Sequence, residues 1–325
     1  MPRITLHLKT MADFFGIDTS NYTTSAAIYS SDENIIYQSK KMLPVKHGEL
    51  GLRQSDAVFH HTKQLPEVLR GLFGVCENKI EAIGVSSKPR NTEKSYMPCF
   101  LCGVAAANSA SLVSNAPIYQ TSHQIGHILA ALYSADALKL IDKPFYAYHI
   151  SGGTTDLLLC TPDDENILNI ERIGGTSDLN AGQAVDRIGV AMGFDFPAGK
   201  QIEEYALRSD KKYNPKVSIN GLCCSLSGVE NKCEKMLFDG QNKADVARFC
   251  LDIIAKSIIN TALNAIEQNA YPFVFAGGVM SNSIIREQIE NKIFDCCFAA
   301  PEFSCDNAAG CAIYAYLKHT RKNPI

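Results

Sequence analysis

The feature that most constrains the fold is a strand–turn–strand pattern that occurs twice in the chain. The first copy, residues 14–42, reads FFGIDTSNYTTSAAIYSSDENIIYQSKKM, in which apolar runs alternate with a Gly/Asp/Ser/Thr turn and a second polar turn. The second copy, residues 144–173, reads PFYAYHISGGTTDLLLCTPDDENILNIERI and repeats this order roughly 130 residues later. We therefore expect an internally duplicated chain in which each half opens with a β-meander.

Apolar spacing typical of helices follows each meander. Strands that precede helices in both halves, with their polar turns facing each other, predict an α/β fold of two lobes that enclose a central cleft. We place lobe I at residues 1–141, with a C-terminal helix over 306–325 packing back on it, and lobe II at 142–305. The other expected elements are helices over about 55–72, 102–113, 181–193 and 243–268, strands over 117–122 and 271–279, a helix that carries His123 and His127, and a helix from 283.

Composition places the chain among globular proteins. Its hydrophobic fraction is 46% and its charged fraction 20%, and no segment approaches the ~20 apolar residues that span a bilayer. The N-terminal residues lack the apolar run of a secretory signal, so we expect a cytoplasmic protein that does not enter a membrane. The net charge is −3, so any nucleic-acid contact requires a local basic patch or a partner protein.

Two histidines form the first candidate site. His123 and His127 are four residues apart, so on a helix they share one face with Cβ atoms about 5–6 Å apart, close enough to bind one cation. Either histidine can instead be an ordinary hydrogen-bonded residue. Asp306, at the expected start of the last helix, is our candidate for a third, anionic ligand, the alternative being a plain helix N-cap. A His-His-carboxylate set with open positions suits zinc or ferrous iron.

The polar turns are candidate phosphate sites. The turn from His149 to Thr155 reads HISGGTT, and its two glycines let the backbone approach a phosphate while its hydroxyls donate hydrogen bonds. Asp18, Thr19 and Ser20 form the corresponding turn in lobe I. Each turn taken alone can be an ordinary hairpin connection. Two such turns in register across a duplicated fold favour a nucleotide or phosphate ligand.

Two further segments of lobe II point to a nucleotide. Residues 276–282, AGGVMSN, follow an apolar strand and precede a helix, so this turn can hold an adenosine or phosphate at the helix N-terminus. Asp186 lies on an expected helix with glycine-rich flanks, where its carboxylate can bind ribose hydroxyls. The alternative for Asp186 is an acidic residue on a helix surface.

The order of these motifs along the chain is similar to that of a known protein family. GIDTS, HQIGH, SGGTTDL, AGQAVDR with PAG, AGGVMSN and CDNAAG follow one another over nearly the whole chain. This series resembles the TsaD family, also called the glycoprotease or O-sialoglycoprotein endopeptidase family. The resemblance implies an actin/Hsp70/sugar-kinase-like (ASKHA) duplicated two-lobe fold. It also implies transfer of a threonylcarbamoyl group from threonylcarbamoyl-AMP to N6 of adenosine 37 in tRNA.

The resemblance also implies roles for individual residues. It makes His123, His127 and Asp306 the ligands of one divalent metal ion per subunit, with iron or zinc expected before magnesium. The residues implied for binding the substrate, which is ATP, AMP or threonylcarbamoyl-AMP, are His149, Ile150, Ser151, Gly152, Gly153, Asp186, Gly199 and Asn282. The implied partners are tRNA and a TsaB-like ASKHA protein with other threonylcarbamoylation proteins, or a second copy of the chain. No catalytic residue is assigned.

The chain departs from the family pattern at several motifs. The family usually carries an acidic pair where this chain has residues 21–24, NYTT, and it has SGGHT where this chain has SGGTT. The usual GEAFDK is GQAVDR here, the usual GGVVPE stretch appears as residues 48–54, and a Gly-Pro-Gly turn is replaced by residues 86–90. These departures keep three functions open: a tRNA threonylcarbamoyltransferase, a carbamoyl or acyl transferase with a small-molecule or protein acceptor, and a non-catalytic nucleotide-binding regulator.

Overall fold

The computed structural model describes residues 12–20, 22–44, 52–74, 78–92, 95–304 and 306–322. The chain forms two compact units, Met1–Ala130 with Asp306–Ile325, and Ala131–Cys305. It passes from the first unit to the second inside helix α3 (His123–Ser134), earlier than the expected position at residue 141. Two places where the sequence departs from the family pattern, residue 21 and most of residues 48–54, lie outside the described residues.

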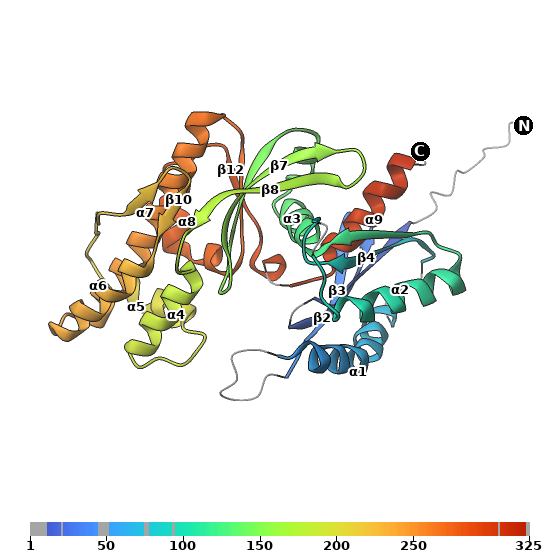
Figure 1. The fold of residues 1–325 in the computed structure, drawn as a ribbon, viewed down its shortest axis with the longest axis horizontal. Coiled ribbons are helices and arrows are strands. Elements are labelled where there is room, and N and C mark those ends of the chain that lie inside the picture. The colour runs from blue at the N-terminus through green and yellow to red at the C-terminus, as the bar shows by residue number, and fades with distance from the viewer. Residues whose placement is uncertain are drawn as a thin grey trace, which may run out of the picture. The chain divides into compact units, whose positions relative to one another are not determined.

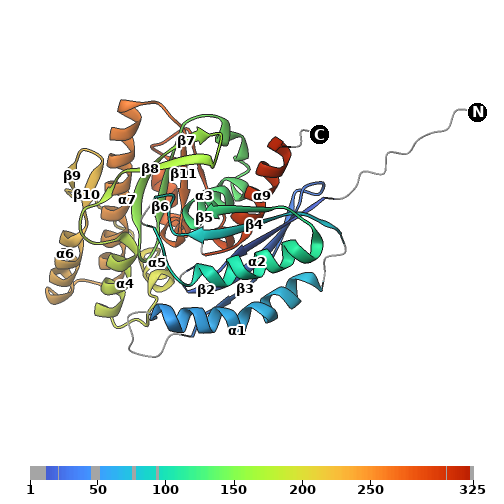
Figure 2. The same cartoon turned by 45° about the vertical axis from the view of Figure 1, so that its right-hand side comes forward.

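The first unit is built on a five-stranded sheet. Its strand order is β3-β2-β1-β4-β5, in which β1, β2 and β3 pair antiparallel while β4 and β5 add to β1 in parallel. Figures 1 and 2 show α1 and α2 on one face of this sheet and α9 on the other. The elements are β1 (Asp13–Asp18), β2 (Thr23–Ser30), β3 (Ile35–Met42), α1 (Gln54–Phe73), β4 (Ile80–Lys88), α2 (Phe100–Ser114), β5 (Ile118–Ser122) and α9 (Ala309–Lys322).

Glycines set how closely α9 approaches the sheet. A Cβ atom at Gly84 on β4 would lie 1.9 Å from the carbonyl oxygen of Cys311, and one at Gly16 on β1 would lie 2.4 Å from that of Ala308. Real Cβ atoms do not come this close to backbone, so only glycine fits at these two strand positions. The α9 backbone therefore lies directly on β1 and β4.

The second unit is built on a seven-stranded sheet of order β12-β11-β6-β7-β8-β10-β9. Strands β6, β7 and β8 form an antiparallel meander, and β11 and β12 add to β6 in parallel. Its strands are β6 (Phe145–Ile150), β7 (Thr155–Asp163), β8 (Ile167–Thr176), β9 (Ser218–Asn220), β10 (Cys223–Ser225), β11 (Phe273–Ala276) and β12 (Cys296–Phe298). Its helices are η1 (Leu138–Asp142), α4 (Ala181–Ala191), α5 (Gly199–Ala206), α6 (Ser227–Phe238), α7 (Lys243–Gln268), η2 (Gly278–Ser281), α8 (Ser283–Glu290) and η3 (Pro301–Phe303).

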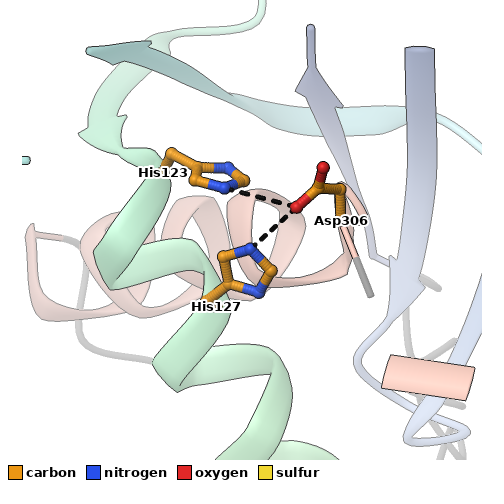
Figure 3. A group of neighbouring side chains, drawn as sticks. All are labelled: His123, His127 and Asp306. Atoms are coloured by element: carbon orange, nitrogen blue, oxygen red, sulfur yellow. Dashed lines mark hydrogen bonds and ion pairs between the residues drawn. The ribbon is translucent and has the colours of Figure 1, made fainter. Parts of the chain in front are cut away.

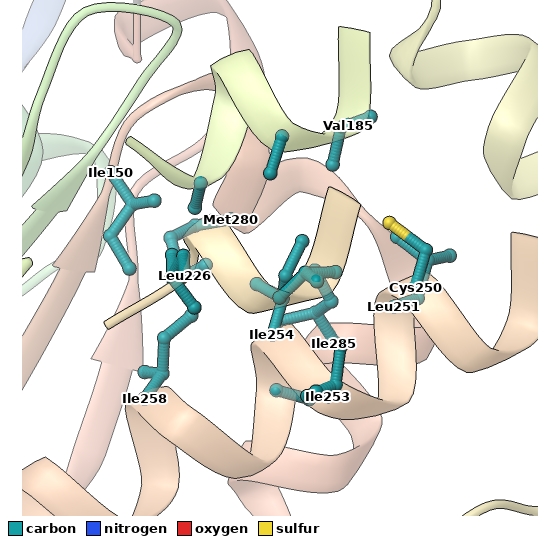
Figure 4. Close-up of a cluster of buried hydrophobic side chains, with 14 of the residues drawn as sticks. Ile150, Val185, Leu226, Cys250, Leu251, Ile253, Ile254, Ile258, Met280 and Ile285 are labelled. Carbon is teal, nitrogen blue, oxygen red and sulfur yellow. The ribbon is translucent and has the colours of Figure 1, made fainter. Parts of the chain in front are cut away.

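The core of the second unit surrounds α7. Figure 4 shows part of this cluster, in which Ile254 and Ile258 of α7 pack with side chains from the strand end at Ile150, from α4 and from α8. Contrary to the expectation from sequence, α7 is long and apolar enough to cross a membrane by length and composition alone. Because 67% of the most apolar 18-residue stretch of α7 is buried, α7 has the character of a core helix.

The internal duplication is confirmed. In both sheets a three-stranded antiparallel meander comes first, and two parallel strands then add beside its first strand. The last helix is a correction, because α9 begins at Ala309 rather than at residue 306. Helices α5 and α6 and strands β9, β10 and β12 were not predicted. These elements are short, or their apolar residues do not recur at a regular helical or strand spacing. Their apolar residues are buried because the folded chain packs them into the core of the second unit.

Candidate metal centre and nucleotide-binding turns

Helix α3 presents the two predicted histidines at one edge of the first sheet. Strand β5 ends at Ser122 and α3 begins at His123 with no intervening loop. The Ser122 hydroxyl oxygen accepts a hydrogen bond from the Ile125 N–H at 3.3 Å, which satisfies a free amide of the first helical turn. His123 and His127 then lie one turn apart, with ring centroids 4.3 Å apart.

Asp306 completes the group. Its Oδ1 atom lies 3.1 Å from His127 Nε2 and 3.5 Å from His123 Nε2, and Figure 3 shows both rings turned toward this carboxylate. Asp306 precedes α9, and the Asn307 carboxamide, not Asp306, accepts from the Ala309 N–H at 3.0 Å. The Asp306 carboxylate is therefore directed at the histidines, and the simple N-cap interpretation does not describe it.

The geometry fits a metal ion. One ligand atom from each of His123, His127 and Asp306 lies within 4.8 Å of the others. In a tetrahedral site with bonds of about 2.05 Å, neighbouring ligand atoms are about 3.3 Å apart, close to the two histidine–carboxylate distances. Two imidazole nitrogens and one carboxylate oxygen suit zinc or ferrous iron and leave positions for a substrate oxygen. The three residues can thus hold one divalent ion.

A contact between two glycines brings α3 and the start of α9 together. Gly126 lies between the two histidines, and a Cβ atom at Gly310 would lie 1.8 Å from the Gly126 carbonyl oxygen. The two backbones therefore meet with no side chain between them. This close approach places Asp306 within reach of both imidazoles.

The site is strongly charged and little exposed. Burial would lower the pKa of His123, but the carboxylates of Asp18 and Asp306 raise it to about 10. Burial would raise the pKa of Asp306, but hydrogen bonds and positive charge from both histidines hold it well below its ordinary value. Opposite charges thus stabilise each other in a poorly solvated site. A bound metal replaces the ring proton as the partner of the histidine nitrogen.

Asp18, which was predicted as part of a phosphate turn, contacts the cluster through His123. His123 Nδ1–H donates to Asp18 Oδ2 at 2.7 Å, which leaves Nε2 facing Asp306. Such carboxylate–histidine–metal arrangements fix the ring tautomer and orientation. The predicted phosphate turn contained Asp18, and that role stays a prediction. No local pattern marked this role, because it depends on β1 and β5 both pairing in parallel with β4, so that their carboxyl ends meet at one edge of the sheet.

The other two residues of that turn are buried within the first unit. Thr19 Oγ1 donates to the Cys99 carbonyl oxygen at 2.9 Å and accepts from the Gly103 N–H at 3.0 Å, which ties the turn to α2. The Ser20 N–H donates to Asp18 Oδ1 at 2.8 Å. Both residues are fully buried, so the turn is a tightly packed part of this unit.

In the second unit, the SGGT turn joins β6 to β7. The Ser151 N–H donates to the Thr154 carbonyl oxygen at 2.8 Å, which closes the turn. The Asn180 carboxamide donates to the Gly153 carbonyl oxygen at 3.0 Å, and the Thr155 hydroxyl oxygen accepts from the Ala181 N–H at 2.9 Å. The N-terminus of α4 is therefore attached to the turn. Asn180 was not among the predicted residues, although an Asn just before a helical segment is a typical N-cap signal.

Glycines around this turn divide into packed and open positions. A Cβ atom at Gly182 of α4 would lie 2.6 Å from the Ser151 carbonyl oxygen, and one at Gly277, where φ is +100°, would lie 2.2 Å from that of Ile150. These glycines let α4 and the AGG turn touch the end of β6. A Cβ atom at Gly152 or Gly153 would meet nothing within 4 Å. Neither φ nor packing requires glycine there, so the open backbone is suited to a ligand.

The remaining predicted residues of the second unit have structural partners as well. Asp186 Oδ1 accepts from the Ala198 N–H at 2.8 Å, which holds the loop before Gly199, and burial raises the pKa of Asp186. Asn282 caps α8 by accepting from the Ile285 N–H at 3.1 Å. His149 is half-buried on β6, and the Ile150 side chain is in the core, so Ile150 can reach a ligand only through its backbone.

Comparisons with known proteins give the family. The family model described as TsaD, tRNA N6-adenosine threonylcarbamoyltransferase, matches residues 34–313. A protein of that name from Thermosipho africanus (strain TCF52B) is 27% identical over 314 residues, covering 93% of this chain and 92% of its own. One from Neorickettsia sennetsu (strain ATCC VR-367 / Miyayama) is 28% identical over 290 residues, covering 85% and 83%.

Solved structures show the fold. Full-length HypF in its phosphate- and nucleotide-bound form matches with a TM-score of 0.59 at 12% identity, over 97% of this chain and 47% of that chain, so this chain spans about half of HypF. Component A of the (R)-2-hydroxyglutaryl-CoA dehydratase of Acidaminococcus fermentans matches with a TM-score of 0.53 at 17% identity, over 94% and 98%. The expected ASKHA fold is confirmed. Because the family model matches residues 34–313, which are most of this chain, the chain belongs to the TsaD family of tRNA N6-adenosine threonylcarbamoyltransferases.

Proposed function

We propose that this chain transfers a threonylcarbamoyl group from threonylcarbamoyl-AMP to N6 of adenosine 37 in tRNA. In this reaction the N6 nitrogen bonds to the carbamoyl carbonyl carbon, the bond from that carbon to the phosphate oxygen breaks, AMP leaves and one proton is released. The observation that supports this most is the His123–His127–Asp306 cluster, backed by Asp18, in a chain that matches the family over residues 34–313.

In this proposal the first unit holds the metal. His123 and His127 supply two nitrogen ligands and Asp306 one oxygen ligand, a set that favours iron or zinc over magnesium. When bound, such an ion withdraws electron density from a carbonyl or phosphoryl oxygen. The side chains themselves orient the ion and, being only 12–23% exposed, restrict the access of water to it.

The second unit holds the adenylate in this proposal. The open backbone at Gly152 and Gly153 accepts a phosphate, and the N-terminus of α4, tied to the same turn, adds the positive end of a helix dipole. Asp186 lies one turn further along α4 and is the candidate partner for ribose hydroxyls. These residues position the ligand rather than react with it.

A TsaB-like ASKHA protein is the partner that we propose. The first unit exposes large apolar side chains on α1 and α2, of which Phe59, Leu101, Leu112 and Val113 are 62%, 53%, 82% and 88% exposed. Exposed apolar side chains on neighbouring helices are typical of surfaces that bind another protein. Leu112→Glu is expected to abolish co-elution with such a partner in size-exclusion chromatography, and unchanged co-elution would remove this surface from consideration.

A second candidate function is carbamoyl or acyl transfer to another acceptor. It is favoured by Thr154, which stands where the family motif SGGHT carries histidine, since an imidazole near the adenylate is lost. A non-catalytic regulator is the third candidate. The metal cluster argues against it, because a scaffold has no need of a metal site.

The test is reconstitution with a family partner. The purified chain, a TsaB-like protein, the adenylate-forming enzyme, threonine, bicarbonate, ATP and unmodified tRNA are incubated, and the nucleosides are analysed by mass spectrometry. Threonylcarbamoyladenosine at position 37 is expected with the wild-type chain and with the control Glu290→Ala, which changes an exposed residue of α8, and none with His123→Ala. AMP release above the level seen without the chain, with the tRNA unmodified, would mean that the chain transfers the group to water instead of tRNA, which would favour the second candidate. Absence of both products would sink the proposed transfer.

A further inference from the structure

The Asp18 carboxylate divides its hydrogen bonds between its two oxygens. Oδ2 receives the His123 Nδ1–H at 2.7 Å. Oδ1 receives the Ser86 hydroxyl at 2.6 Å and the Ser20 N–H at 2.8 Å. The carboxylate is thus fixed in rotation, with one oxygen reserved for the histidine.

Ser86 is itself rigidly placed. It lies on β4 next to β1, where Ile17 pairs with Val85, and its side chain is fully buried. The Cys311 thiol of α9 lies beside both Ser86 and Asp18, and burial holds the pKa of that thiol well above its ordinary value, so it remains neutral. The segment that supplies Asp306 therefore also closes the space around Ser86.

We propose that Ser86 is a positioning residue for the metal centre, which acts through Asp18 on His123. Without the Ser86 hydroxyl, Oδ1 keeps one donor and the carboxylate gains freedom to rotate. His123 Nδ1–H then loses its fixed acceptor, and the Nε2 lone pair is less well aimed at the ion. Outer-shell partners of this kind typically change metal affinity by about 10- to 100-fold when removed.

The neighbouring serine provides a matched control. Ser87 lies next in β4, and its hydroxyl donates to the Thr121 carbonyl oxygen at 3.4 Å, away from Asp18. Ser86→Ala and Ser87→Ala remove the same atom from adjacent positions on one strand. Asp18→Asn keeps the size of the side chain but removes its negative charge and one of the two acceptor oxygens, so His123 and Ser86 can no longer both donate to it.

The experiment measures metal binding, not transfer activity. The 325-residue chain is stripped of metal, checked by thermal unfolding, and titrated with Zn²⁺ against a chromophoric chelator. We expect Ser86→Ala to bind Zn²⁺ about 10-fold more weakly and Asp18→Asn about 100-fold more weakly. Ser87→Ala should bind as the wild type does. The Co²⁺ absorption spectrum should change in Ser86→Ala and not in Ser87→Ala.

A double mutant tests the route of the effect. If Ser86 acts through Asp18, then Ser86→Ala combined with Asp18→Asn binds no more weakly than Asp18→Asn alone. Additive losses, or wild-type affinity of Ser86→Ala, would overturn the proposal. If Ser86→Ala does not fold, Ser86→Cys decides, because it keeps the side-chain shape but replaces the hydroxyl with a weak donor: weaker binding by the folded protein supports the proposal and wild-type affinity refutes it. The inference rests on the proposed metal centre: no Zn²⁺ binding by the wild type would refute that centre, whereas loss of the difference between Ser86→Ala and Ser87→Ala would refute the role of Ser86 alone. Neither result depends on whether tRNA is the acceptor.

Discussion

Gly310→Ala tests whether the glycine contact between α9 and α3 builds the metal centre. The added Cβ would lie 1.8 Å from the Gly126 carbonyl oxygen and 2.7 Å from the Gly126 Cα atom. To restore ordinary contact the two backbones must separate by about 1.5 Å, because neither has a flexible side chain that can move aside. Asp306 precedes α9 and lies 3.1 Å from His127 Nε2, so a shift of that size breaks the ligand geometry.

Two magnitudes follow for Gly310→Ala. Overpacking of this kind costs about 3 kcal/mol of unfolding free energy, of which about 1 kcal/mol is offset by the better helix propensity of alanine. Metal sites tolerate deviations of only about 0.2 Å, so Zn²⁺ affinity should fall by at least about 100-fold. Urea denaturation gives the first value and competitive chelator titration the second.

Gly126→Ala is the matched control for the same contact. A Cβ atom at Gly126 would lie 3.7 Å from the Cys311 sulfur, which is ordinary van der Waals contact. This variant should therefore keep both stability and Zn²⁺ affinity. Wild-type stability and metal affinity in Gly310→Ala, or equal behaviour of the two variants, would show that the contact does not build the metal centre.

Three further predictions concern the second unit. Burial would raise the pKa of Asp178, but hydrogen bonds from the Ser225 hydroxyl and the Leu226 N–H, before the start of α6, hold it well below 3.8. Its contribution to stability is therefore present above pH 3.8 and is lost as the pH falls below that value. Asp178→Ala should cost about 1 kcal/mol at neutral pH, and less when unfolding is measured in acid. Asp252→Ala removes the buried partner of Arg248 and should cost about 3 kcal/mol, whereas Glu290→Ala, in an exposed pair, should cost under about 1 kcal/mol. Equal losses in denaturation experiments would contradict this. Gly152→Ala should leave stability unchanged and weaken AMP binding in calorimetry, and unaltered binding would remove the turn from the ligand site.

Long, periodic elements were predictable and short ones were not. The helices around residues 55–72 and 243–268 were expected close to their observed bounds, Gln54–Phe73 and Lys243–Gln268, because their apolar residues recur at helical spacing over many turns. Strands β9, β10 and β12 have three residues each, too few for a period to be recognised. The start of α9 was misplaced because Asp306 resembles an N-cap in sequence, while Asn307 performs that function.

The two strand–turn–strand segments and the one-turn spacing of His123 and His127 were readable from the amino-acid order, because each depends on residues that are close along the chain. Asp306 was recognised as a candidate from its residue type, but its contact with His127 joins positions 179 residues apart and exists only in the folded chain. The role of Asp18 was decided by tertiary structure alone. Its bond to His123 spans 105 residues, and no local pattern distinguishes an aspartate that faces a phosphate from one that orients a histidine. The metal centre is where these distant segments meet, because backbone contact at Gly126 and Gly310 lets them approach.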